Sequence, residues 1–218
     1  MNMTKAIDPA NLQTRQIEDF AVVERLFKAR LKQDFPRNEL KPLASMRRSW
    51  EKRAYDCYGL FCGDEILGYA FFVRLGGDYL FDYLAIEKHH RDAGLGSHFL
   101  RQLTACLSDA NCVLVEVEDP DKAENEAARV LRERRLRFYL RNGYLKTDLT
   151  STIFGADYRI LEVPLGSSHS ADEIRDIYTK LYQSILPKLF FRTEFRVNGI
   201  FTDSSGEPMA KCVVQRPG

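Results

Sequence analysis

The chain has 218 residues, of which 44% are hydrophobic and 29% charged, so it has enough apolar side chains to bury a core, and disorder over the whole length is excluded. Lysine and arginine number 32 and aspartate and glutamate 31, and this formal net charge of +1 disfavours a globally basic nucleic-acid binder. No apolar run approaches the roughly 18 residues that span a bilayer and the first residues lack a signal-peptide core, so we expect a soluble, cytoplasmic protein without a membrane partner.

The N-terminal part combines helices with strands. Apolar residues recur every three or four positions from Asp19 to Asp34, which is typical of an amphipathic helix, and Pro36 ends it. After a loop that runs to Pro42, Leu43–Ala54 is predicted to form a second helix. The predicted strands are Thr14–Ile17, Cys57–Cys62, Ile66–Leu75 and Tyr79–Ile86, with glycine-containing turns between the last three.

The middle of the chain continues this alternation. The four-residue apolar repeat in Gly94–Leu107 predicts a helix, and Cys112–Val117 predicts a strand. Asp121–Arg141 is charged and predicted to be helical, with Asp121 and Glu124 as a capping box. Two further strands are predicted at Tyr144–Ile153 and Asp157–Val163.

The C-terminal part is predicted to be an extension. Ser170 and Glu173 form a capping box before a wide apolar stripe that ends at Leu186. Phe190–Val214 alternates like a strand and contains Asn198-Gly199, a hairpin signal. We therefore expect residues 1–166 to form the main domain and residues 167–218 a helix and hairpin packed on it. The apolar stripe must cover either its own sheet or a second subunit, so the protein is expected to be a monomer or a homodimer.

One segment carries a signal for ligand binding. The predicted strand that ends at Ile86 leads into a loop, and the loop opens a helix through Gly94 and Gly96. Glycines let the backbone approach a ligand closely, and the free N–H groups at a helix start form an anion site. The spacing matches neither a Walker loop nor GxGxxG, because no lysine with serine or threonine follows the second glycine.

The run Arg91-x-x-Gly94-x-Gly96 resembles the acyl-CoA pyrophosphate motif of the GNAT acetyltransferase superfamily, and Arg137–Tyr144 resembles its F-Y-x-x-x-G-F/Y segment. The resemblance spans about Ile17 to Val163. It implies an α/β fold of the acyl-CoA N-acyltransferase type, with a mixed central sheet, flanking helices and here a C-terminal extension. It also implies acetyl transfer from acetyl-CoA, the acyl-donor cosubstrate, directly to a primary amine of a small molecule or peptide.

The resemblance further implies roles for individual residues. Tyr139 matches the position whose phenol protonates the leaving thiolate, and Glu116 matches a position that supplies the base in some members. Asp82 is a second base candidate, and Glu118 competes with Glu116 because the two share a strand face. Each of these residues has a structural alternative as a core aromatic or a paired carboxylate. The residues implied to bind acetyl-CoA are Leu84, Ala85, Ile86, Arg91, Asp92, Ala93, Gly94, Leu95, Gly96, Ser97 and Tyr139.

The sequence departs from the family pattern after Glu118, because Arg132 and Arg135 stand where members commonly carry an asparagine. We interpret this arginine-rich stretch as a solvated helix and expect no nucleic-acid partner. The five cysteines and four histidines show no metal-ligand spacing, so no metal ion is expected. The loops at Phe35–Pro42 and Asp119–Glu126 are candidates for contacting the acceptor. A GNAT-like module that binds CoA without catalysis remains the alternative function.

Overall fold

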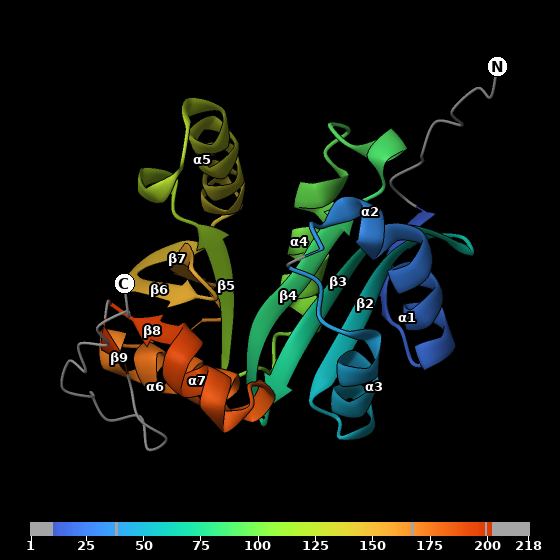
Figure 1. The fold of residues 1–218 in the computed structure, drawn as a ribbon. Helices are drawn as coiled ribbons and strands as arrows, with labels where there is room; N and C mark the ends of the chain where they lie inside the picture. Colours follow the sequence, from blue (N-terminus) through green and yellow to red (C-terminus); the bar gives the residue numbers. More distant parts are fainter. Residues whose placement is uncertain (1–10, 38, 167, 199, 202–218) are drawn as a thin grey trace. The chain divides into compact units, whose positions relative to one another are not determined.

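The computed structural model describes residues 11–37, 39–166, 168–198 and 200–201 of the chain (Figure 1). The chain divides into two compact units. Unit 1 comprises Met1–Arg74 and Phe81–Asp109, and unit 2 comprises Leu75–Leu80 and Ala110–Gly218. Among the described residues, no helix has both the length and the apolar character needed to cross a membrane.

The strands of unit 1 are hydrogen-bonded in the order β1-β2-β3-β4, with bounds β1 Leu12–Gln16, β2 Tyr55–Cys62, β3 Glu65–Leu75 and β4 Asp78–Ile86. The pairs β1/β2 and β2/β3 are antiparallel. Six successive residues of β2, Tyr55–Leu60, are buried, which means that both faces of this strand are covered. The outer strand of this unit is β4, and it leads directly into the predicted ligand-binding loop.

Helices cover both faces of the strands in unit 1. One continuous helical segment consists of α1 (Phe20–Leu26), the π-helical turn η2 (Phe27–Leu31) and α2 (Lys32–Asp34), and it begins where Asp19 caps the N–H of Ala21. Together with α3 (Leu43–Glu51) it lies on the side opposite α4 (Leu95–Cys106) in Figure 1. The side chains of Thr14 and Gln102 hydrogen-bond at 2.6 Å and fasten α4 to β1.

In unit 2 the strand order begins with the first three residues of β4. Asp78–Leu80 pair in parallel with β5 (Cys112–Glu118), and the order then runs through β7 (Ala156–Glu162), β6 (Leu145–Ile153), β8 (Phe195–Val197) and β9 (Ile200–Phe201). The pairs β5/β7, β6/β7, β6/β8 and β8/β9 are antiparallel. The combination of one parallel pair with antiparallel pairs confirms the predicted mixed α/β class.

The charged helix of unit 2 starts later than the sequence predicted. Its first residues instead form the 3₁₀ turn η4 (Pro120–Lys122), in which the Asp119 side chain accepts the N–H of Asp121. Helix α5 spans Glu126–Arg141, and its cap is Asn125, whose side chain accepts the N–H of Ala128. The expected capping box of Asp121 with Glu124 is therefore wrong, because Asp119 and Asn125 provide two separate local caps.

The C-terminal extension confirms one prediction and corrects another. Helix α6 (Ala171–Ile185) begins with the capping box of Ser170 and Glu173, and its apolar stripe is buried within the chain. The segment after Pro187 is a helix, α7 (Lys188–Glu194), where strand alternation was predicted from Phe190 onward. The predicted hairpin is present as β8 and β9, and its expected continuation through residues 202–214 lies outside the described residues.

Candidate active site

The start of α4 in unit 1 has the features of an anion site. Strand β4 passes through the 3₁₀ turn η3 (Lys88–His90) into a loop in which Asp92 has φ +65° and Gly94 has φ +77°. Gly94 occupies the N-cap position of α4 and supplies no side-chain hydrogen bond to the helix. The first amides of the twelve-residue helix thus lack a side-chain cap and are free to bind negatively charged oxygens.

Arg91, the predicted pyrophosphate ligand, has protein partners. Its Nε donates to the carbonyl oxygen of Ile86 at 3.0 Å, and its Nη2 lies 2.6 Å from Oδ1 of Asp34. The other carboxylate oxygen of Asp34 accepts from the Tyr69 hydroxyl at 2.8 Å. Arg91 therefore links the loop to the end of β4 and to α2, and its half-exposed side chain also remains accessible to a phosphate.

The other residues predicted to bind acetyl-CoA differ in their exposure to solvent. Leu84, Ala85 and Ile86 are half-buried at the end of β4, beyond the three residues of β4 that pair with β5. Residues 92–94 are exposed, and Gly96 and Ser97 are half-buried. Leu95 is buried, so its side chain belongs to the core and only its backbone is available to a ligand. A strand end that leads into a helix start without a side-chain cap fits an extended arm that ends in phosphates.

Asp82 is held by two neighbours in unit 1. Its carboxylate lies 2.6 Å from the ammonium of Lys41 and accepts the hydroxyl proton of Tyr55. The adjacent Tyr83 hydroxyl accepts the Lys41 N–H at 2.8 Å and donates to the carbonyl of Glu39 at 2.9 Å. These bonds fasten the loop before α3, so the contacts of Asp82 favour its structural alternative over the role of base.

Tyr139 lies in the last turn of α5 in unit 2. Its ring centroid is 5.3 Å from that of Phe138 and 5.3 Å from that of Tyr144. Its hydroxyl makes no hydrogen bond within the described part of the chain. Burial raises the pKa of the Tyr139 phenol above its usual value, against a lowering effect of Arg135. The phenol therefore stays protonated at neutral pH, as a proton donor must.

Glu116 on β5 is enclosed by two tyrosines of α6 that the sequence analysis missed. The Tyr182 hydroxyl lies 2.8 Å from both carboxylate oxygens, and the Tyr178 hydroxyl also donates to Glu116. Ser151 on β6 lies 2.7 Å from the Tyr178 hydroxyl and extends the network. Burial and the Glu116 carboxylate raise the pKa of both phenols well above 10.0. The sequence offers only a weak indication of this contact, because it shows two tyrosines four residues apart within an apolar stripe.

Two further acids of unit 2, Glu118 and Asp119, are paired with arginines. Glu118 lies 3.3 Å from Arg132 and also pairs with Arg135, so the three residues form an ion-pair cluster. Asp119 is buried and lies 2.7 Å from Nε of Arg159. Carboxylates already neutralised in this way give little electrostatic attraction to a cationic acceptor.

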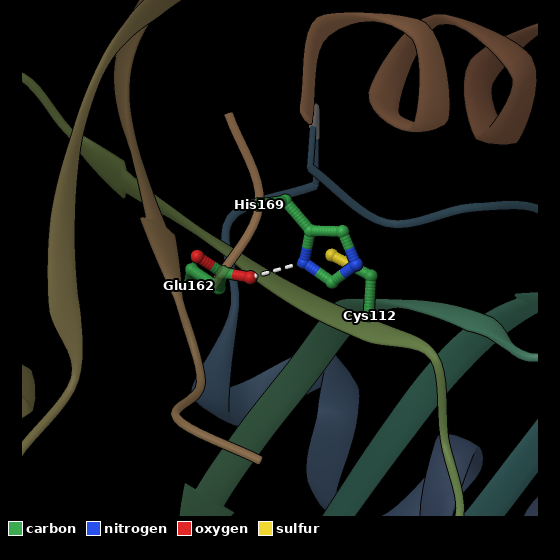
Figure 2. A group of neighbouring side chains, drawn as sticks. All are labelled: Cys112, Glu162 and His169. Atoms are coloured by element: carbon green, nitrogen blue, oxygen red, sulfur yellow. Dashed lines mark hydrogen bonds and ion pairs between the residues drawn. The ribbon is translucent and has the colours of Figure 1, made fainter. Parts of the chain in front are cut away.

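Folding also brings together three side chains that were not grouped by sequence spacing: Cys112, Glu162 and His169 (Figure 2). Nδ1 of His169 lies 2.6 Å from Oε1 of Glu162. Burial, together with the carboxylates of Glu162 and Asp78, raises the pKa of the Cys112 thiol to about 12. The expectation of no metal ion was based on the spacing of cysteines and histidines along the sequence. Such spacing cannot reveal a cluster whose three residues come from separate segments of the chain.

Comparison with solved structures identifies the fold. A structure from Bacteroides thetaiotaomicron, assigned as a GNAT-family acetyltransferase, superposes with a TM-score of 0.61 at 20% identity, covering 78% of this chain and 96% of that one. A second, from Desulfovibrio desulfuricans and assigned to the same family, gives 0.51 at 16% identity over 71% of this chain and 99% of that one. A third, from Staphylococcus epidermidis and assigned as an acetyltransferase, gives 0.51 at 9% identity, covering 70% and 98%. No protein-family model and no curated protein matches the sequence. The chain therefore has the fold of the GNAT acetyltransferases.

Proposed function

We propose that this protein is an N-acetyltransferase that moves an acetyl group from acetyl-CoA to a primary amine of a small molecule or peptide. The observation that carries the proposal is the uncapped start of α4, where Gly94 in the left-handed region follows the outer strand of unit 1. The GNAT fold supports it as well, because the Arg91-x-x-Gly94-x-Gly96 motif falls at this helix start.

The donor is assigned to unit 1. The backbone of Leu84–Ile86 offers hydrogen bonds to an extended pantetheine arm, and one of its N–H groups can stabilise the carbonyl oxygen as it gains negative charge. The first amides of α4 and the guanidinium of Arg91 bind the pyrophosphate. Because Arg91 is already fixed by Ile86 and Asp34, it is preorganised for this contact.

We assign proton transfer to Glu116 and Tyr139. A lysine-like amine has a pKa near 10.4, so at pH 7 it must lose a proton before it attacks. Glu116 takes that proton, directly or through water, while the nitrogen bonds to the acetyl carbon and the carbon–sulfur bond breaks. Tyr139 gives a proton to the departing thiolate. The nitrogen loses a second proton as the amide forms, and this proton makes up for the one that Tyr139 gives to sulfur. The proton on Glu116 passes to solvent, so the transfer needs no further reactant.

One observation favours a second candidate, a module that binds CoA without catalysis. Both predicted bases, Glu116 and Asp82, are occupied by neighbouring donors. If these contacts persist when the donor is bound, neither carboxylate is available to an amine. The two candidates share the donor site and differ in turnover.

The donor site is tested by isothermal titration of acetyl-CoA into two matched glycine variants. Gly94 has φ +77° and Gly63 has φ +61°, and a Cβ on either would meet nothing within 4 Å. Alanine therefore strains both positions similarly, but only Gly94→Ala changes the start of α4. Since anion contacts at a partly buried helix start contribute up to about 2 kcal/mol, we expect Gly94→Ala to weaken binding by about tenfold or more. Equal affinity in both folded variants would reject the site.

Turnover separates the two candidates. Release of free CoA thiol is followed with acetyl-CoA and a panel of polyamines, amino sugars, lysine peptides and peptides with free N-termini. We expect at least one amine to release CoA thiol and gain an acetyl group by mass spectrometry. Tight acetyl-CoA binding with no transfer to any amine at any pH would favour the non-catalytic module.

A further inference from the structure

Cys112, Glu162 and His169 form a compact cluster in unit 2. Cys112 is the first residue of β5, Glu162 is the last residue of β7, and His169 immediately precedes the Ser170 cap of α6. One potential ligand atom from each side chain lies within 4.8 Å of the other two. Figure 2 shows the three side chains pointing toward one another from separate segments.

The cluster is buried and rich in negative charge. Cys112 is 1% exposed and Glu162 4%, and the side chain of His169 is 13% exposed. Asp78 lies opposite Cys112 in the parallel pairing of β4 with β5 and adds a second carboxylate nearby. A buried carboxylate is costly unless a cation or hydrogen-bond donor compensates it, and in this cluster His169 is the residue paired with Glu162.

We propose that Cys112, Glu162 and His169 bind a divalent transition-metal ion, with Zn²⁺ as the preferred ion. A thiolate, an imidazole and a carboxylate are ligands that Zn²⁺ takes in proteins, whereas Mg²⁺ and Ca²⁺ prefer oxygen ligands throughout. Binding displaces the thiol proton of Cys112 to solvent, and water completes a four-coordinate site.

The spacing of the three groups suits this ion. Bond lengths of about 2.0–2.3 Å to a tetrahedral Zn²⁺ place ligand atoms about 3.3–3.6 Å apart. In the cluster the imidazole nitrogen and the carboxylate oxygen are 2.6 Å apart, and all three ligand atoms lie within 4.8 Å of one another. Binding of the ion therefore replaces the hydrogen bond between His169 and Glu162 with two metal–ligand bonds.

The site would fasten α6 to the sheet of unit 2. Its ligands come from two paired strands and from the residue just before the helix, and the same helix carries Tyr178 and Tyr182 to Glu116. The ion would act as a structural link, and its presence does not depend on acetyl transfer. Its test therefore reads out metal binding and stability, and neither outcome bears on the proposed function.

The experiment uses the purified full chain after chelator treatment. Zn²⁺ binding is measured by competition with a chromogenic chelator, and Co²⁺ is titrated as a spectroscopic probe whose thiolate charge-transfer band reports a sulfur ligand. We expect one Zn²⁺ per chain and a Co²⁺–thiolate band that disappears in Cys112→Ser. Loss of an outer-shell partner typically costs 10–100-fold in metal affinity, so removing a direct ligand in His169→Gln should cost at least tenfold. Zn²⁺ should raise the melting temperature of the wild-type chain and of neither variant.

Two matched controls test the assignment. Cys106→Ser removes an exposed thiol, and His90→Gln disrupts the more exposed Glu65–Glu87–His90 group, so both should bind Zn²⁺ like the wild type. If Cys112→Ser does not fold, His169→Gln decides alone, because its side chain lies outside the regular strands. A wild-type chain without a Co²⁺–thiolate band, or equal Zn²⁺ affinity in the wild type and His169→Gln, would overturn the proposal and leave only a hydrogen bond between Glu162 and His169.

Discussion

Replacing Tyr182 with phenylalanine tests how strongly α6 is held to β5. The change removes one hydroxyl that lies 2.8 Å from both carboxylate oxygens of Glu116, and the ring remains packed 4.8 Å from Phe195 and 5.1 Å from Tyr178. A hydrogen bond to a charged group contributes about 1.5–3 kcal/mol. Tyr178 still donates to Glu116 in the variant, so the carboxylate is not left without a partner. We therefore expect a loss of about 1.5–3 kcal/mol, or about 3–12 °C in melting temperature.

Tyr139→Phe is the matched control. Tyr139 also lies in unit 2, but its hydroxyl makes no hydrogen bond within the described residues, so its removal should change the unfolding free energy by less than about 0.5 kcal/mol. Urea and thermal melts are followed by far-UV circular dichroism, because the single tryptophan, Trp50, lies in unit 1 and reports on the other unit.

A double-mutant cycle with Glu116→Gln isolates the pairwise interaction. We expect a coupling free energy within about 0.5–3 kcal/mol between positions 116 and 182. If Tyr182→Phe is as stable as Tyr139→Phe and the coupling is zero, the hydroxyl does not hold the helix and the reasoning from this network is refuted.

The remaining predictions concern chemistry, pH and packing. Tyr139→Phe should slow acetyl transfer by about 10²–10⁴-fold with unchanged acetyl-CoA affinity, and a wild-type rate would show that its phenol is not the acid. Burial and the Glu116 carboxylate raise the pKa of Tyr178 and Tyr182 in the folded state above 10.0, so their contribution to stability is complete below about pH 10 and is lost as pH rises further. Urea melts from pH 8 to 11 should show this loss, and the double phenylalanine variant should flatten it; parallel curves would contradict it. Leu181 is fully buried, so Leu181→Asp should cost more than about 3 kcal/mol and give poorly soluble protein, whereas Ala171→Asp at the exposed first position of α6 should melt like the wild type.

Local patterns were enough to predict most elements and the glycine-containing turn into α4. The capping box of Ser170 with Glu173 marks the start of α6 because both bonds form within one turn. Gly94 stands where the chain turns from loop into helix with positive φ, a requirement that acts on a single residue. The same locality explains the error at α7. Phe191 and Phe195 fit the alternation of a strand, but a spacing of four residues also fits a helix. In the structure Phe191 lies in α7 and Phe195 begins β8, and their stacked ring centroids are 4.9 Å apart.

Contacts between distant residues were decided only by the tertiary structure. Glu116 meets Tyr178 and Tyr182 across more than sixty positions of the chain, because β6 and β7 return to β5 and α6 then lies over them. Cys112, Glu162 and His169 meet for the same reason. Hydrophobic periodicity specifies which face of an element is buried, but which polar groups meet on that face depends on strand register and on where the next helix lies. The sequence could therefore indicate a candidate donor loop and name candidate acids and bases, whereas the partners that hold those side chains emerged only from the fold.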